Sequence, residues 1–197
     1  MNTRTKSFQD AWDLFPKMAC AKMCEQAARE AIALESEHRA RNLPVRMQQS
    51  ITRPEVAVVE RIQPAINHSI ILKELAFDTL SKICQFYSFE VLGNFISDKL
   101  ILKPPGCPGY SLHKDSDYWE EKPGFHTGSI AIFLNDSPVD SGPIMLPEKN
   151  SEENAFMPIN GHIGDVLFFG GGVQHWSSPN ISENYRRTLY LSFHMKT

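Results

Sequence analysis

The chain has 197 residues, with 20 Lys and Arg against 23 Asp and Glu, which gives a formal net charge of −3. This length suits one domain with its own hydrophobic core, and 42% hydrophobic residues is ordinary for a globular protein. The near-neutral charge, without a dense basic block, argues against nucleic acid as the main partner. No apolar run approaches the ~20 residues that cross a bilayer, so we expect no membrane association. The first residues lack the apolar segment of a secretory signal, which predicts a cytoplasmic protein.

The first part of the chain is predicted to be mainly helical. Apolar residues recur at three- and four-residue steps over residues 7–42, which is typical of a helix. Residues 45–51 fit a short strand. Residues 54–68 fit a second helix, interrupted by Pro64, and residues 69–87 fit a third.

After residue 88 the pattern becomes strand-like. Short runs of β-branched and aromatic residues are separated by Gly and Pro turns, which favours a sandwich or barrel. The predicted strands are 89–96, 99–103, 127–134, 144–146, 166–169, 173–176 and 188–195. We therefore interpret residues 1–197 as one domain of the α+β class. Its mainly helical part, residues 1–87, is expected to pack on a β-rich catalytic core, residues 88–197.

A candidate metal site begins at His113 and Asp115. Alternate residues of a strand share a face, so these two side chains would point the same way if this segment is a strand. His175 is the best third ligand, because it follows a predicted strand and a glycine-rich turn. Two histidines and one carboxylate leave the other metal positions open, an arrangement that suits non-haem Fe(II) in oxygenases.

A series of motifs surrounds these residues in a characteristic order. They are LKPPG at 102–106, HKD at 113–115 with Tyr118-Trp119 behind it, IAIFLND at 130–136, SGPIMLP at 141–147, GDVLFF at 164–169, HWSSPN at 175–180 and the closing Arg186-Arg187. Together they resemble the phytanoyl-CoA dioxygenase (PhyH-like) family over roughly residues 62–195. The resemblance implies a double-stranded β-helix, a jelly-roll or cupin-like core. It also implies Fe(II), O₂ and the cosubstrate 2-oxoglutarate.

The resemblance also implies roles for individual residues. His113, Asp115 and His175 would be the iron ligands. Arg186 would bind the distal carboxylate of 2-oxoglutarate, with Ser177 as a helper. Lys103 would point into the cavity mouth near 2-oxoglutarate, or it would be an ordinary edge-strand lysine.

The residues themselves also favour Arg186 as a carboxylate anchor. A dicarboxylate that chelates a metal at one end needs a cation at the other, and a guanidinium binds carboxylate in a bidentate way. Arg186 shares strand parity with the polar row Thr188, Tyr190 and Ser192, whereas Arg187 shares it with apolar residues. The polar row is the better candidate for a ligand wall.

Three features concern the substrate pocket. Tyr118 and Trp119 either line it or pack beneath a loop. Ala131 stands where the family usually has a Trp, which predicts a larger or differently placed pocket. The segment between Leu146 and Gly161 is shorter than in the family. A short segment there predicts a more open site, or one that a second subunit closes in a homo-oligomer.

The predicted function is an Fe(II)- and 2-oxoglutarate-dependent dioxygenase. It would hydroxylate a C–H bond of a small-molecule substrate and release succinate and CO₂. The same cofactors also support desaturation, epoxidation or cyclisation. A different class of protein also fits, namely a cupin-like metal- or ligand-binding module without turnover.

Overall fold

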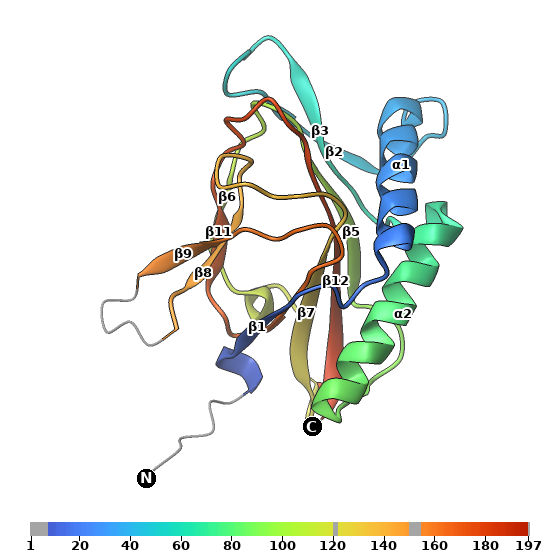
Figure 1. The fold of residues 1–197 in the computed structure, drawn as a ribbon, viewed down its shortest axis with the longest axis vertical. Helices are drawn as coiled ribbons and strands as arrows, with labels where there is room; N and C mark the ends of the chain where they lie inside the picture. The colour runs from blue at the N-terminus through green and yellow to red at the C-terminus, as the bar shows by residue number, and fades with distance from the viewer. Residues whose placement is uncertain (1–7, 120–121, 150–154, 197) are drawn as a thin grey trace.

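Two antiparallel sheets face each other in a computed structural model that describes residues 8–119, 122–149 and 155–196 (Figure 1). The larger sheet has the strand order β1-β10-β7-β12-β5-β3-β2, with β4 paired to β12. Its strands are β1 (Trp12–Phe15), β2 (Val45–Gln49), β3 (Ala57–Ile62), β4 (Glu90–Val91), β5 (Ser97–Lys103), β7 (His126–Phe133), β10 (Val166–Gly170) and β12 (Arg186–Lys196). The smaller sheet contains, in spatial order, β6 (Tyr110–His113), β11 (His175–Ser177), β8 (Ile144–Pro147) and β9 (Phe156–Ile159).

Two helices, α1 (Ala21–Glu37) and α2 (Ile70–Tyr87), cover the outer face of the larger sheet (Figure 1). Each buries residues at helical spacing, because one stripe of a helix must leave water when it packs on a sheet. In α1 the stripe is Cys24, Ala27, Ala31 and Leu34. Helix α2 begins at an N-cap, where the Ser69 hydroxyl accepts a hydrogen bond from the backbone N–H of Leu72.

The long strand β12 shows how the sheet separates two environments. Leu189, Leu191 and Phe193 belong to the core beneath the helices. The alternate residues Arg186 and Tyr190 face the space between the two sheets. This separation follows from the two-residue period of a strand, and it places the predicted polar row on the inner face.

The N-terminal part differs from its predicted helical character. The predicted helix over 7–42 is wrong at its start, where β1 (Trp12–Phe15) pairs with β10 before α1 begins at Ala21. The predicted helix over 54–68 is also wrong, because β3 (Ala57–Ile62) pairs with both β2 and β5 and only the 3₁₀ helix Ile66–His68 follows. Partners far away in the chain override the local pattern in both cases. The larger sheet therefore crosses the expected boundary at residue 87.

The predictions for the second half hold more closely. Strands over 99–103, 127–134, 144–146, 166–169 and 188–195 are confirmed with shifts of at most a few residues at their ends. The predicted strand over 89–96 shortens to β4 (Glu90–Val91), and the predicted strand over 173–176 becomes β11 (His175–Ser177). Strand β9 (Phe156–Ile159) was not predicted, and residues 150–154 of the short segment before it lie outside the described residues.

Neither α1, α2 nor any other helix of the described ranges has the length and apolarity needed to cross a membrane.

Candidate functional site

Three side chains that can bind a metal converge between the two sheets. His113 ends β6 and His175 begins β11, and these residues are direct partners in the antiparallel pair. The sequence suggested that Asp115 lies on the same strand as His113. In the structure, Asp115 instead begins the 3₁₀ helix Asp115–Asp117. Its carboxylate Oδ1 still lies 4.0 Å from His113 Nε2 and 3.8 Å from His175 Nε2. The candidate ligand atoms all lie within 4.8 Å of one another.

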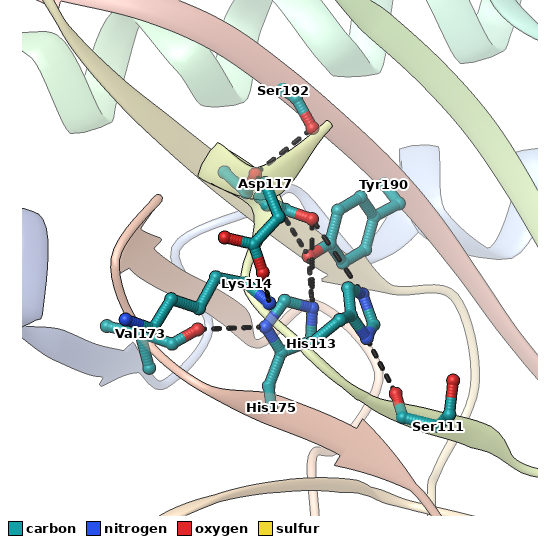
Figure 2. A network of polar contacts seen from close by, with 10 residues as sticks. Ser111, His113, Lys114, Asp117, Val173, His175, Tyr190 and Ser192 are labelled. Carbon is teal, nitrogen blue, oxygen red and sulfur yellow. Dashed lines mark hydrogen bonds and ion pairs between the residues drawn. The ribbon is translucent and has the colours of Figure 1, made fainter. Parts of the chain in front are cut away.

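Hydrogen bonds fix which atom of each histidine faces this space (Figure 2). Nδ1 of His113 lies 2.7 Å from the Ser111 carbonyl oxygen, and Nδ1 of His175 lies 3.1 Å from the Val173 carbonyl oxygen. A carbonyl only accepts, so both Nδ1 atoms carry a proton, and in the neutral imidazole Nε2 is then the atom that can bind a metal. Burial also lowers the pKa of His175, which favours the neutral imidazole that a metal requires.

The carboxylate of Asp115 is oriented in the same manner. Its Oδ2 accepts hydrogen bonds from the Ser129 hydroxyl at 2.5 Å and the Tyr190 hydroxyl at 3.1 Å. The Ser129 hydroxyl also lies 3.1 Å from the Ser192 hydroxyl. These contacts leave Oδ1 as the oxygen that points toward the histidines. Orienting partners of this kind set the geometry and affinity of a metal site. The sequence reasoning did not recognise Ser129 as such a partner, because its role depends on contacts between distant segments.

A cavity of about 600 Å³ extends from these residues. Arg186 lines it, with only 2% of its surface exposed, and its Nε and Nη1 atoms have no hydrogen-bond partner. The Thr188 hydroxyl beside it is likewise buried and unpartnered. Burial lowers the pKa of Arg186 to about 10, so the guanidinium stays charged at neutral pH. A buried cation without a carboxylate partner costs folding free energy, and the anionic end of a bound ligand would neutralise it.

Lys103 is not among the residues that line the cavity, and its strand β5 lies between β12 and β3, so it lies neither at the cavity mouth nor at a sheet edge as the sequence predicted. It is fully buried, and its Nζ lies within hydrogen-bond distance of the Ser177 hydroxyl (2.7 Å), the Gly142 carbonyl (3.2 Å) and the Ser178 carbonyl. Burial, with the charge of Arg186, lowers its pKa to about 6. Gly142 has a φ of +76°, and a Cβ there would lie 2.8 Å from the lysine Nζ. Glycine is therefore required where the chain passes over Lys103.

The remaining predicted site residues divide into two groups. Ser177, Tyr118 and Trp119 line the cavity, and the Tyr118 ring lies 5.6 Å from the His113 ring. Ala131 is fully buried in the core between the sheets, opposite Tyr190 on one neighbouring strand and Leu167 on the other. It is not among the residues that line the cavity.

Comparison with known proteins assigns the chain to a protein family. The family model for phytanoyl-CoA dioxygenase (PhyH) matches residues 12–188. The chain belongs to the phytanoyl-CoA dioxygenase family. This membership confirms the predicted family. The family match begins at residue 12, in β1, a strand that the sequence analysis had interpreted as helix.

One relative and two solved structures illustrate the range of the similarity. A methylphosphonate hydroxylase of Gimesia maris is 30% identical over 113 residues, which cover 49% of this chain and 43% of that protein. The chain thus spans less than half of that relative. The α-ketoglutarate-dependent epimerase SnoN of nogalamycin biosynthesis superposes with a TM-score of 0.74 at 14% identity, covering 94% of this chain and 78% of SnoN. EctD of S. alaskensis superposes with a TM-score of 0.74 at 16% identity, covering 94% and 73%.

These superpositions confirm the predicted fold class, an α+β chain with a jelly-roll core. SnoN has been solved with Fe³⁺ and α-ketoglutarate, and EctD with 2-oxoglutarate and 5-hydroxyectoine. In the PhyH-family chain described here, the donor set fits the same cofactors, because it offers two imidazole nitrogens, one carboxylate oxygen and a buried guanidinium across the cavity.

The cavity also contains residues that the sequence analysis missed. Arg46, Arg61 and Lys99 line its outer part. Lys99 shares strand parity with Lys103, so its inward direction was accessible from the sequence. Arg61 was not, because it fell inside a predicted helix that is in fact β3.

Proposed function

We propose that this protein is an Fe(II)- and 2-oxoglutarate-dependent dioxygenase that hydroxylates a C–H bond of a small molecule. The observation that carries this proposal is the position of a buried, unpaired Arg186 in the same cavity as His113, Asp115 and His175. A site that only stores a metal has no use for a buried cation beside its open positions. A cosubstrate that chelates a metal at one end and carries a carboxylate at the other uses both.

In this proposal each residue has a physical task. His113, Asp115 and His175 hold Fe(II) through Nε2, Oδ1 and Nε2. Arg186 and the Ser177 hydroxyl bind the distal carboxylate of 2-oxoglutarate, and Lys103 holds Ser177 in place. When bound, iron with 2-oxoglutarate supplies the activation of O₂, with decarboxylation of the keto acid to succinate and CO₂. The surrounding apolar residues keep the inner end of the cavity dry.

Hydroxylation is favoured over the other outcomes because the methylphosphonate relative, at 30% identity, is a hydroxylase. That relative also makes methylphosphonate a reasonable first compound for a substrate screen. Because the fold neighbours include an epimerase, the outcome requires a product analysis. The product of a hydroxylase contains one oxygen atom more than the substrate, whereas the product of a desaturase or cyclase contains two hydrogen atoms fewer.

The decisive test starts from purified full-length protein without oxygen. Addition of Fe(II) and 2-oxoglutarate should produce a weak visible charge-transfer band. In the Arg186→Met variant, the same band should require a much higher concentration of 2-oxoglutarate. Addition of O₂ should then release succinate in proportion to oxygen consumed. Metal binding without the band and without succinate, across a broad substrate panel, would instead identify a binding module. Closure of the site by a second subunit stays a prediction, which light scattering of the protein can check.

A further inference from the structure

The outer wall of the cavity carries positive charge that the proposed cofactors do not use. It is formed by β2, β3 and β5, and its charged residues are Arg46, Arg61 and Lys99. Arg61 is the cross-strand partner of Ile101. Lys99 lies two residues before Ile101 on the same face, which makes Arg61 and Lys99 diagonal neighbours about 7–8 Å apart at their backbones. Two cations from different strands thus point into one part of the cavity.

Only one of these three cations has an acidic partner. Arg46 lies 3.1 Å from the buried carboxylate of Glu60, to which Gln48 also donates. Neither Arg61 nor Lys99 takes part in any ion pair formed within residues 8–119, 122–149 and 155–196. Asp115 is the only carboxylate among the described residues that line the cavity, and its role is to bind the metal. Arg186 is matched by 2-oxoglutarate. In the part of the chain that the structure describes, Lys99 feels the charge of Asp115, which the metal would share, and neither Arg61 nor Lys99 has an ion-pair partner of its own.

Two aromatic side chains lie close to Lys99. Its ammonium lies 5.5 Å from the centroid of the Tyr190 ring and 5.9 Å from that of Trp119. The indole N–H of Trp119 is buried without a hydrogen-bond partner. Burial lowers the pKa of Lys99, the carboxylate of Asp115 raises it, and the charge of Arg61 lowers it. An oxyanion between these groups would relieve the repulsion and satisfy the indole N–H at once.

The wall lies close to the metal site. Tyr190 contacts Lys99 through its ring and donates its hydroxyl hydrogen to Asp115. Any group that Lys99 binds is therefore one side chain away from a metal ligand. This closeness limits the distance between a bound anion and the carbon that reacts.

We propose that the substrate carries an anionic group, a phosphonate, phosphate or carboxylate, which Arg61, Lys99 and the Trp119 indole bind, a few bonds away from the C–H bond that is oxidised. The location of that bond rests on the proposed function, whereas the anion site itself does not. The wall acts as a specificity determinant: it selects small anions and rejects neutral or cationic molecules of the same shape.

The test measures binding to the full-length protein under anaerobic conditions with Fe(II) and saturating 2-oxoglutarate, so that Arg186 is already occupied. Calorimetric titrations use methylphosphonate, inorganic phosphate and acetate as anionic probes and dimethyl methylphosphonate as the uncharged analogue. At least one anion should bind, and the uncharged diester should not. The comparison of phosphonate, phosphate and acetate identifies which anion the wall prefers.

Two variants locate the binding site. Lys99→Met and Arg61→Gln should each raise the Kd of the anion at least ~10-fold, because each loses a charge-assisted contact. The matched controls Lys73→Met and Arg29→Gln, on exposed positions of α2 and α1, should leave it unchanged. The Kd of 2-oxoglutarate should stay within ~3-fold in all four proteins, which also reports that the wall variants are folded.

Two results would overturn the proposal: no measurable anion binding by a protein that binds 2-oxoglutarate, or anion binding that neither wall variant weakens. Failure of the proposed function gives a different pattern. In that case 2-oxoglutarate would not bind, while the anion titration without cofactors would still depend on Lys99 and Arg61.

Discussion

Two regions of the cavity differ in how their polar groups are held. The inner end is the region of His113, Asp115, His175 and Arg186, and the outer end is the wall with Arg46, Arg61 and Lys99. At the inner end, Asp115 and both histidines are hydrogen-bonded to fixed partners, and Arg186 is buried. At the outer end, Arg61 and Lys99 are half-buried, and Arg46 is mostly exposed. A rigid inner end suits a cofactor set that a whole family shares. An outer end with unpaired charges suits recognition that differs from one relative to the next.

The largest effect should come from breaking the inner end at a metal ligand. His113→Ala removes one of the three proposed metal ligands, and 20% of the His113 side chain is exposed, so the fold should survive. We expect the affinity for iron to fall more than ~100-fold and turnover to vanish. This loss is larger than the one typical of removing a residue that only orients a ligand. Metal analysis after dialysis checks this. Stoichiometric iron in the variant would place the metal elsewhere.

The second prediction uses two adjacent arginines on opposite faces of β12. Arg186→Met should weaken 2-oxoglutarate binding by about 2–5 kcal/mol, at least ~30-fold in Kd, because it removes a desolvated charge-assisted contact. It should also raise the melting temperature of the ligand-free protein, because an uncompensated buried charge is removed. Titration of the charge-transfer band and a thermal melt measure the two effects.

Arg187→Met is the matched control, since Arg187 stacks on the Tyr185 ring at 4.4 Å and feels the charge of Glu35 on the helix side. It should leave 2-oxoglutarate affinity nearly unchanged. A larger loss of affinity in Arg187→Met than in Arg186→Met would mean that the cavity face of β12 has been assigned wrongly.

The third prediction sharpens the idea that fixed partners hold the inner end. Ser129→Ala deletes one of the two hydrogen bonds to Asp115 Oδ2 and leaves that of Tyr190. Iron affinity should fall about 10-fold, the lower end of the range for such partners. Ser192→Ala is the control, because Ser192 contacts Ser129 but not Asp115. Equal losses in both variants would show that the effect comes from packing and not from the orientation of the carboxylate.

The sequence predicted the inner end better than the outer end for a physical reason. The proposed metal ligands lie within short motifs that the resemblance locates, and Arg186 begins the long, alternating strand β12, which the local pattern locates. The outer wall depends on β2 and β3; β2 is the edge strand, and β3 pairs with β2 on one side and β5 on the other. Such strands are stabilised by pairing, as Arg61 is with Ile101, and no local pattern records a partner 40 residues away.

The same argument explains the N-terminal errors. The strand Trp12–Phe15 exists because it pairs with residues 166–169 of β10. Its sequence alone fits the apolar spacing of the helix that follows. Ala131 illustrates a further limit. Parity predicted correctly that it shares a face with Ser129, and that face does point between the sheets, but parity does not tell how deep along the strand the cavity reaches.

The last prediction concerns Ala131 and should have the smallest effect on function. The sequence predicted that Ala131 leaves room for a larger or differently placed substrate pocket, which Ala131→Trp would then obstruct. The structure places Ala131 between Tyr190 and Leu167 in a closed core, where an indole has no space. Overpacking of this kind costs about 1–3 kcal/mol of unfolding free energy, so urea denaturation should show a clear loss. Ala57→Trp, at an exposed position of β3, is the matched control and should show little change. In the folded fraction of Ala131→Trp, substrate KM should remain close to that of the parent. A raised KM with unchanged stability would instead mean that the cavity extends past Tyr190 to Ala131 when substrate binds, and the inner end would then be less rigid than its hydrogen bonds indicate.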